Sequence, residues 1–359
     1  MESLKNTDKL LIFRSAGIGD FLVILPFINY LINVVGIKRE NIIFVIINKY
    51  DVNPLKLLFL ENDPLVINSI VLNQNNGFLK SLNYVKQCLK GKSFSKVIYL
   101  PFINEPISSK IKKYIAIKYI IKGNKTVYGL NFKKNNFNIG TQYLTYFEQL
   151  NLNNFKKYLN FNFKDITAIR DDEYTKINYF EINNGKKNIA LYINSKLTMK
   201  IWNRENYKQI IEYIQSHHDV NIYLVGGQED IEYNDAFIED YKLKEVYNLA
   251  GEYSIRETIL LFDKFELLIG NDGSPLHMAA YSSCSILGIY TYKEEVTSWE
   301  PYSAKNFIII RKNVSCKHCY LEFCENVICL EELNTIDVLQ ALKELLSLSQ
   351  PLRQTRIIL

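Results

Sequence analysis

The sequence lacks any apolar stretch long enough to cross a membrane as a helix. Its hydrophobic runs have the length of strands or are broken by charged residues, whereas a spanning helix needs about 18 uninterrupted apolar residues. Residues 1–13 hold a short apolar run without the basic leader and the small-residue cleavage site of a secretory signal. We therefore expect a cytoplasmic protein.

The sequence also lacks a block of charge of one sign. Its 43 basic and 38 acidic residues are spread along the chain and give a net charge of +5. This distribution argues against a dedicated nucleic-acid footprint, whereas a small positive excess favours weak attraction to phosphates or to an anionic membrane surface. We therefore expect no nucleic-acid partner and keep peripheral association with the inner face of a membrane as an open alternative.

What the sequence does contain is typical of a folded protein of two domains. Hydrophobic residues make up 48% and charged residues 23% of the 359 residues, and this length exceeds what one core usually organises. Residues 166–187 are polar and charged, and they separate two more apolar halves. This pattern predicts a linker between domains at residues 1–165 and 188–345, with residues 346–359 as a C-terminal extension.

Each half alternates strand-like and helix-like segments. In the first half, strands are expected at residues 10–13, 42–47, 69–72 and 96–100, and the alternation restarts at residue 188. Such alternation predicts, in each half, a parallel sheet covered by helices on both faces, with a cleft between two Rossmann-like halves. Open sheets of this type bind ligands beyond the carboxyl ends of their strands, so the residues that follow each strand are site candidates.

The first candidate segment is residues 14–26, RSAGIGDFLVILP. A predicted strand runs through a turn with Gly17 and Gly19 into an apolar helix, whose free amides could hold an anion. Asp20 is expected at the mouth of the cleft. Without further evidence, an Asp at this position more often only accepts hydrogen bonds from backbone N–H groups at the start of a helix.

Two further candidates follow strands of the second half. Lys200 lies a few residues after the strand expected at residues 188–193, where its ammonium could meet a diphosphate, although a lone loop lysine is usually only solvated. Gly226 and Gly227 would let a ligand lie against the backbone, while Glu229 could accept hydrogen bonds from sugar hydroxyls. A plain turn with acids at the start of a helix explains this second pattern equally well.

The most informative segment is residues 267–280, LLIGNDGSPLHMAA. A predicted strand ends in an Asn-Asp-Gly-Ser turn that opens a helix, and His277 lies one turn into that helix. Amides, a hydroxyl and an imidazole from Asp272, Gly273, Ser274 and His277 are therefore expected to converge on one anion-sized volume. A histidine that only faces the core is the alternative.

Taken in order along the chain, these segments resemble glycosyltransferase family 9, the lipopolysaccharide heptosyltransferase family. The shared features are R-x-x-x-x-G-D before a later Pro, K-x-W before an acidic helix start, the Gly-Gly turn, and D-(T/G)-(G/S)-x-x-H-x-A-A, in which Gly273-Ser274 stands where the family usually has Thr-Gly. Residues 248–257, NLAGEYSIRE, and the cysteine-bearing residues 316–338 match further segments of the family. The resemblance runs from about residue 9 to residue 345.

The resemblance implies a GT-B architecture, in which two Rossmann-like α/β domains face each other across a central cleft. The N-terminal domain would bind the acceptor, and the C-terminal domain would bind the donor. It implies an inverting, metal-independent transfer of a heptose-like sugar from a nucleotide-diphosphate donor, ADP-heptose being favoured, to a lipopolysaccharide, glycolipid, surface-glycan or protein acceptor. Asp20 would then be the base, and Lys200 and His277 would bind the diphosphate. The other residues implied to form the donor site are Gly19, Gly226, Gly227, Glu229, Asp272, Gly273 and Ser274.

Four of the six cysteines, Cys316, Cys319, Cys324 and Cys329, lie close together in the sequence. In a cytosolic protein, such clustering indicates metal ligands or reduced thiols rather than disulfides. The first pair has zinc-type spacing, but the later gaps are not those of a common zinc ribbon. We therefore expect either a structural Zn or Fe site or four reduced thiols, and no cofactor for catalysis.

Two other functions are compatible with the same pattern. A nucleotide-sugar epimerase of the GT-B type would share the cleft and the diphosphate site, and a water-activating pair of acids in the second half would favour it. An inactive family member could serve as an assembly subunit. The presence of Asp20, Lys200 and His277 argues against such a loss of activity.

Overall fold

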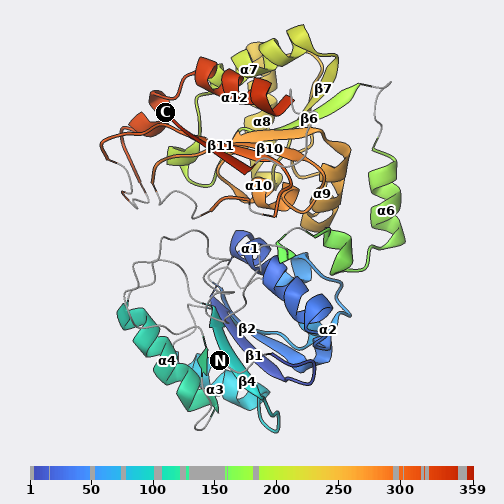
Figure 1. The fold of residues 1–359 in the computed structure, drawn as a ribbon, viewed down its shortest axis with the longest axis vertical. Helices are drawn as coiled ribbons and strands as arrows, with labels where there is room; N and C mark the ends of the chain where they lie inside the picture. The colour runs from blue at the N-terminus through green and yellow to red at the C-terminus, as the bar shows by residue number, and fades with distance from the viewer. Residues whose placement is uncertain are drawn as a thin grey trace. The chain divides into compact units, whose positions relative to one another are not determined.

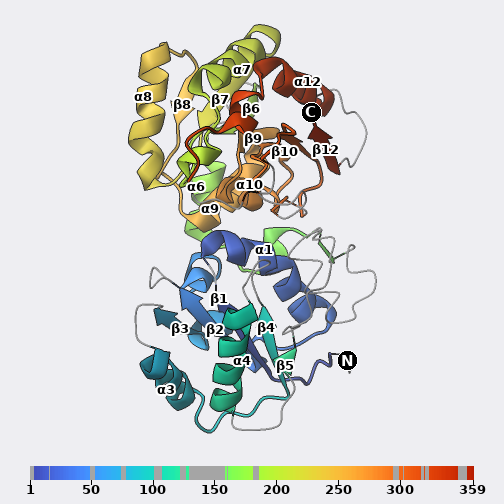
Figure 2. The same ribbon diagram turned by 90° about the vertical axis from the view of Figure 1, so that its left-hand side faces the viewer.

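The computed structural model of the chain describes residues 4–15, 17–48, 53–73, 78–100, 107–121, 127–128, 158–159, 161–180, 186–293, 299–301, 303–316, 319, 323–346 and 354–359. The chain divides into two compact units. Unit 1 comprises residues 1–159 and 164–168, and unit 2 comprises residues 160–163 and 169–359. Each unit is a sheet flanked by helices (Figures 1 and 2). No described helix is long and apolar enough to cross a membrane.

Unit 1 is built on a five-stranded parallel sheet with the strand order β3-β2-β1-β4-β5. Its strands are β1 (Leu10–Ser15), β2 (Ile42–Asn48), β3 (Ile70–Asn73), β4 (Lys96–Leu100) and β5 (Val127–Tyr128). Its α-helices are α1 (Ile18–Asn29), α2 (Pro64–Ile67), α3 (Phe78–Cys88) and α4 (Ile107–Ile121).

The continuous apolar runs of these strands follow from burial on both faces of the sheet. Successive side chains of a strand point to opposite faces. On β2, Phe44 therefore contacts Phe21 of α1 on one face. Val45 lies on the other face, in a core cluster with Val85 of α3 and Ile117 of α4. Both layers remove apolar area from water, which is the main stabilising contribution to such a sheet.

Unit 2 is built on a seven-stranded parallel sheet with the strand order β12-β11-β10-β9-β6-β7-β8. Its strands are β6 (Lys187–Tyr192), β7 (Val220–Leu224), β8 (Val246–Asn248), β9 (Leu267–Asn271), β10 (Ser285–Ile289), β11 (Phe307–Arg311) and β12 (Gln354–Ile358). Its α-helices are α6 (Asp171–Asn178), α7 (Arg204–His217), α8 (Ile231–Tyr241), α9 (Ile255–Leu261), α10 (Ser274–Ala279), α11 (Ile328–Glu331) and α12 (Thr335–Leu346). The predicted parallel α/β architecture is thus confirmed in both units.

Two segments of unit 2 differ from their sequence-based description. Residues 354–358, in the expected C-terminal extension, form β12 and pair in parallel with β11. Residues 171–178, in the expected linker, form helix α6. Both segments have polar compositions that resemble loops, and both are ordered by partners that are distant in the sequence.

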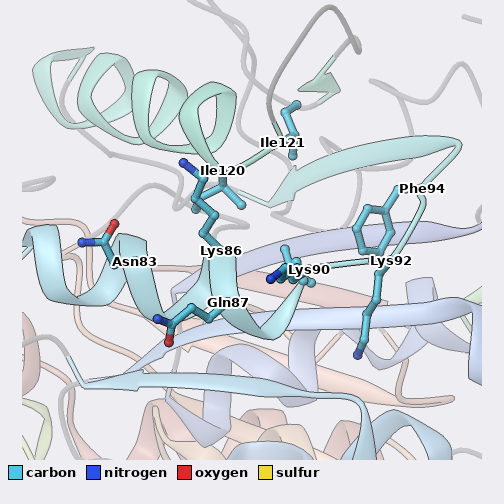
Figure 3. Close-up of a pocket in the computed structure, with 10 residues that line it drawn as sticks. Asn83, Lys86, Gln87, Lys90, Lys92, Phe94, Ile120 and Ile121 are labelled. Atoms are coloured by element: carbon cyan, nitrogen blue, oxygen red, sulfur yellow. The ribbon is translucent and has the colours of Figure 1, made fainter.

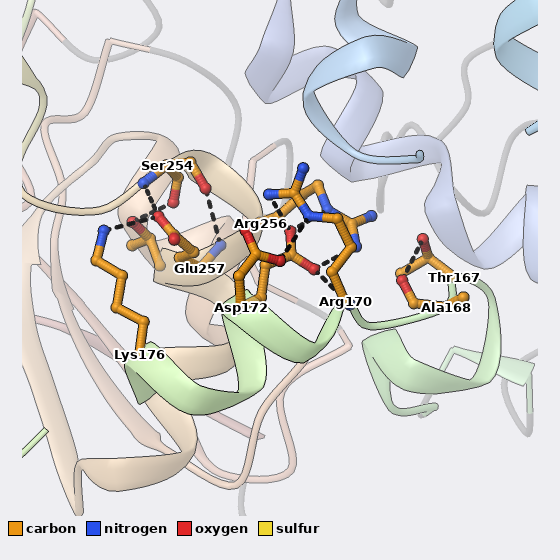
Figure 4. A network of polar contacts seen from close by, with 10 residues as sticks. Thr167, Ala168, Arg170, Asp172, Lys176, Ser254, Arg256 and Glu257 are labelled. Atoms are coloured by element: carbon orange, nitrogen blue, oxygen red, sulfur yellow. Dashed lines mark hydrogen bonds and ion pairs between the residues drawn. The ribbon is translucent and has the colours of Figure 1, made fainter. Parts of the chain in front are cut away.

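A buried ion pair between Glu173 of α6 and Arg256 of α9 connects the two helices (Figure 4). Glu173 is fully buried, and its two carboxylate oxygens accept hydrogen bonds from Nε and Nη2 of Arg256 at 2.6 and 2.8 Å. The backbone N–H of Arg170 donates to the same carboxylate at 3.0 Å. Burial alone would raise the pKa of Glu173, but these donors outweigh it and hold the pKa below its ordinary value.

Candidate active site

The carboxyl ends of β6, β7 and β9 lie at the same edge of the unit 2 sheet, and Asn271 links the end of β9 to the segment that follows β6. Asn271 ends β9 and is completely buried. Its side-chain oxygen accepts hydrogen bonds from the backbone of Trp202 at 3.1 Å and from the hydroxyl of Tyr207 at 2.8 Å. Its amide group donates to the carbonyl of Asn194, beyond β6, at 3.2 Å. This bonding fixes the loop that carries Lys200 relative to the end of β9.

Lys200 is not a solvated loop lysine. Its Nζ lies 2.5 Å from Oδ2 of Asp272, and the two side chains are only 15% and 11% exposed. Lys200 belongs to a short 3₁₀ turn, Thr198–Lys200, and Asp272 follows β9 directly. The two elements therefore present a positioned ammonium, partly withdrawn from water, at the end of the sheet.

His277 lies beside this pair, in helix α10, and is 5% exposed. Burial lowers the pKa of His277 to about 4; Asp272 opposes this change, whereas the positive charge of Lys200 adds to it. The imidazole is therefore neutral near pH 7. Its Nδ1 has no hydrogen-bond partner within the described segments, which is costly for a buried polar atom. The ring also lies edge-on to Trp299, with ring centroids 6.4 Å apart.

The glycines near this cluster are required by Tyr192, the last residue of β6. A Cβ added at Gly273 would lie 2.5 Å from the Tyr192 ring, and one added at Gly270 would lie 2.8 Å from the Tyr192 Cβ. Gly273 immediately precedes α10, which begins at Ser274. Glycine here therefore allows β6 and the turn before α10 to approach closely.

The Gly226-Gly227 turn at the end of β7 is filled by a carboxylate of the protein itself. The Asp230 side chain accepts hydrogen bonds from the backbone N–H of Gly227 at 2.8 Å and from the side chain of Asn194 at 2.7 Å. A Cβ at Gly226 would lie 2.4 Å from Oδ2 of Asp230. Glu229, in contrast, is exposed, with Lys196 at 4.0 Å. Gly226 thus accommodates Asp230, whereas a Cβ added at Gly227 would lie 2.4 Å from Oε2 of Glu229. Glu229 is the carboxylate that remains accessible to a ligand.

The carboxylates of Asp230, Glu229 and Asp272 lie near the side chain of Tyr192. Burial raises the pKa of its hydroxyl, and the charges of Asp230, Glu229 and Asp272 raise it further. The structure therefore brings the predicted residues after β6, β7 and β9 to one edge of the unit 2 sheet. Sequence reasoning missed Tyr192, Asn194, Asp230 and Asn271, although each follows or ends a predicted strand and is polar.

In unit 1, Gly19 and Asp20 lie in the first turn of α1, which begins at Ile18. The side chain of Asp20 lies outside the described residues. A Cβ added at Gly19 would meet no atom within 4 Å in the described part of the chain. This unit has a cavity of about 380 Å³ between its sheet and the helices α3 and α4; Leu72 and Ile117 are among its apolar lining residues, and Lys113 is a charged one.

The four clustered cysteines, Cys316, Cys319, Cys324 and Cys329, are free thiols in the described part of the chain. Within the part of the chain that the structure describes, no group of three or more His, Cys, Asp or Glu side chains could hold a metal ion. Cys316 is exposed, whereas Cys329 is buried in a small cluster with Tyr292 and Val314. Burial raises the pKa of the Cys329 thiol, and the nearby Cys316 and Cys324 raise it further. Such an environment favours the protonated thiol.

Two parallel α/β units, the second with a lysine, a carboxylate and a histidine at the carboxyl ends of its strands, define the GT-B class of glycosyltransferase folds. Residues 104–327 match the family model of glycosyltransferase family 9 (heptosyltransferase). This match covers more than half of the chain, and the chain therefore belongs to glycosyltransferase family 9.

Individual relatives are distant. Over 170 residues, the chain is 23% identical to lipooligosaccharide heptosyltransferase 2 of Campylobacter jejuni, a match that covers 46% of this chain and 53% of that protein. The fold is similar to a family 9 glycosyltransferase of Veillonella parvula, with a TM-score of 0.68, 16% identity and coverage of 96% and 99% of the two chains. It is also similar to ADP-heptose lps heptosyltransferase II of E. coli, with a TM-score of 0.56, 15% identity and coverage of 94% and 98%.

Proposed function

We propose that this protein transfers a heptose-like sugar, with inversion, from a nucleotide-diphosphate donor to a lipopolysaccharide, surface-glycan or protein acceptor. ADP-heptose is the favoured donor, because the similar E. coli structure is described as an ADP-heptose enzyme. The observation that carries the proposal is the cluster of Lys200, Asp272 and His277 at the carboxyl edge of the unit 2 sheet, where open α/β sheets bind their ligands.

The cluster suits a departing diphosphate, which gains negative charge as the bond to the sugar breaks. The ammonium of Lys200 would stabilise this charge, and Asp272 would act as a positioning residue because it holds that ammonium in place at 2.5 Å. The neutral imidazole of His277 would donate a hydrogen bond to a phosphate oxygen. Groups fixed before the reaction cost no reorganisation when the charge develops, which is why such arrangements accelerate group transfer.

We assign the remaining roles by the order of the motifs. Asp20 of α1 is the proposed base that removes the proton of the acceptor hydroxyl, or a group that orients this hydroxyl, because a helix start favours the ionised carboxylate and weakens it as a base. Glu229 is the proposed partner of donor hydroxyl groups. Gly19, Gly226, Gly227, Gly273 and Ser274 are proposed to line the donor side of the site.

The proposed reaction needs no cofactor. A structural Zn or Fe ion on Cys316, Cys319, Cys324 and Cys329 is a separate proposal that rests on sequence clustering alone. No step of the proposed reaction depends on this ion. A glycolipid acceptor would require the protein to work at the inner face of a membrane.

The direct test measures donor recognition and product together. Purified protein is heated with a panel of nucleotide sugars, and ADP-heptose should raise the melting temperature most, because a ligand that binds only the native state stabilises it. Incubation with a glycan acceptor should then give a product with the anomeric configuration opposite to that of the donor. A modified free sugar nucleotide in the absence of acceptor would instead identify an epimerase and contradict the proposal.

A further inference from the structure

Helix α4 of unit 1 is apolar on two opposite faces. Its inner face packs in the core through Ala116, Ile117 and Ile120, which are 3–8% exposed. Its outer face carries Ile111 and Ile115, which are 44% and 61% exposed. A surface helix normally has one apolar stripe, directed at the core. The packing of the described residues of unit 1 therefore does not explain the outer stripe.

Tyr119 continues this outer stripe, since residues spaced by four lie on one side of a helix. Its ring is 50% exposed, and Nζ of Lys86, from the neighbouring helix α3, lies 4.1 Å from the ring centroid. By helix geometry, Lys112 and Lys118 lie on either side of the stripe. The result is an exposed apolar line bordered by ammonium groups.

Positive charge dominates this part of unit 1. The segments 78–100 and 107–121 contain no Asp or Glu. The lysines of α3, α4 and the turn between α3 and β4 include Lys80, Lys86, Lys90, Lys92, Lys112 and Lys118. Of these, Lys80, Lys86, Lys90, Lys92 and Lys112 form no ion pair with an acidic side chain of the described residues. We use the name α3–α4 face for these six lysines together with Ile111, Ile115 and Tyr119.

A cavity of about 580 Å³ opens where α3 and α4 end (Figure 3). Lys86, Lys90 and Lys92 are among its lining residues, with Phe94 and Ile121 as apolar ones. Lys86 is shared by the cavity and by the contact with Tyr119, so the cavity adjoins the apolar stripe. A lining of three lysines and several apolar side chains suits a phosphate group attached to an apolar body.

We propose that the α3–α4 face binds the surface of an anionic lipid bilayer, with the stripe inserted among the acyl chains and the cavity occupied by a lipid phosphate headgroup. Charge complementarity selects this partner. Two copies of the face would repel each other through their lysines, and a nucleic acid would leave the stripe exposed to water. A bilayer with anionic headgroups satisfies both features, as it does for amphipathic helices with lysines on the polar side.

The test is co-sedimentation of the full chain with vesicles, without donor or acceptor, so its outcome does not depend on the proposed function. Vesicles of phosphatidylcholine with about 30% phosphatidylglycerol should bind the protein, and pure phosphatidylcholine vesicles should not. Binding should weaken as salt rises from about 0.01 M to about 0.1 M, because the screening length falls from about 30 to about 10 Å. Equal binding to both vesicle types would overturn the proposal.

Variants locate the surface. Ile111→Ser with Ile115→Ser should weaken vesicle binding at least about tenfold, since both exposed side chains would lose burial in the bilayer. Lys90→Ala with Lys92→Ala should weaken it about 25-fold, at roughly fivefold per lysine. The matched control is Ile67→Ser, a 66% exposed isoleucine of α2, which should bind as wild type does. All variants should keep the wild-type melting temperature.

Other partners would give different results. If the face joins two copies of the chain, light scattering will show a dimer that Ile111→Ser with Ile115→Ser dissociates, and the proposal fails. If it binds nucleic acid, a mixed-sequence duplex will compete with the vesicles and will bind the isoleucine variant as tightly as wild type, and the proposal also fails. Loss of vesicle binding in both pairs of variants, with Ile67→Ser unaffected, is the result that supports it.

Discussion

The ammonium of Lys200 is held in position by the protein itself. Asp272 binds it at 2.5 Å, and Asn271 fixes the loop on which it lies. A diphosphate would therefore meet a cation whose side-chain entropy has already been lost, so less of the binding energy is used to order the site. The same pairing implies that Lys200 contributes to stability as well as to binding, and an experiment has to separate these two contributions.

Lys200→Ala should weaken donor binding by about tenfold to a hundredfold, because a hydrogen bond to a charged group contributes roughly 1.5–3 kcal/mol. Calorimetry with the nucleotide sugar measures this change. The double variant Lys200→Ala with Asp272→Asn removes the unpaired carboxylate and should recover stability without recovering affinity. Lys187→Ala, at the opposite end of β6 and exposed, is the control that should bind normally. Wild-type affinity in the Lys200 variant would exclude this residue from the site.

Asp20→Asn should lower the turnover number by about 10²- to 10⁴-fold, because Asn keeps the size and hydrogen-bonding capacity of Asp but cannot accept a proton. Donor affinity should be unchanged, and a lost helix-start interaction should cost only about 1 kcal/mol of stability. Turnover, affinity and melting temperature are compared on the same preparation. A folded variant that binds donor and retains more than about a tenth of wild-type turnover would show that Asp20 only orients a group or stabilises the helix.

His277 gives a prediction about pH. Its folded pKa of about 4 lies below the ordinary value of 6.5, so between these two values the unfolded chain binds a proton that the folded protein excludes. The free energy of unfolding should therefore fall as the pH is lowered from 6.5 to 4, by up to about 3 kcal/mol from this residue. Denaturation followed by tryptophan fluorescence reports on unit 2, because both tryptophans, Trp202 and Trp299, belong to it.

The matched variants for this measurement are His277→Gln and His217→Gln. His277→Gln should flatten the decline of stability below pH 6.5, since the buried group that excludes the proton is gone. His217 is exposed on α7, and its replacement should leave the decline as in wild type. Identical pH profiles for wild type and His277→Gln would contradict burial of a neutral imidazole.

At the scale of elements, two ion pairs join α6 to α9, the buried Glu173–Arg256 pair and the more exposed Lys176–Glu257 pair. Glu173→Gln leaves the Arg256 guanidinium buried without its counter-charge and should destabilise unit 2 by about 3–5 kcal/mol. Asp172→Asn, one residue away in the same helix and 72% exposed, should cost less than about 1 kcal/mol. Chemical denaturation with the tryptophan signal measures both. Equal stabilities would show that α6 is held by its other contacts.

The elements also show what the sequence could and could not predict. Strands such as residues 42–47 and 96–100 were predictable, because both-face burial leaves a continuous apolar run between polar breaks. Helix α6 and strand β12 were not, since their largely polar sequences pack against partners distant in the sequence, such as Arg256 for α6 and β11 for β12. The site shows the same division. Motif order alone grouped Lys200, Asp272 and His277, whereas Asn194 required knowledge of which strands are neighbours.

At the scale of the whole molecule, the metal content of the purified protein distinguishes a metal-bound state of the four clustered cysteines from a state with reduced thiols. If Cys316, Cys319, Cys324 and Cys329 share a metal in solution, elemental analysis should give close to one Zn or Fe per chain, and a chelator should lower the melting temperature without abolishing transfer, because binding at a structural site contributes to folding. Cys316→Ser should then remove the metal. Metal-free protein of full stability with four titratable thiols would establish the reduced-thiol alternative.

The strand orders of the two sheets have a consequence for biosynthesis. In unit 1, the order β3-β2-β1-β4-β5 lets β2 and β3 add in turn beside β1, and β4 and β5 then add on its other side. In unit 2, β7 and β8 extend outward from β6, and β9 to β12 then add one after another on its opposite side. Each of the strands that the structure describes can therefore join an existing edge as it leaves the ribosome, and none of them has to insert between two strands already paired. Since domains generally fold as units during synthesis, the sheet of unit 1 can be complete before the first strand of unit 2 emerges.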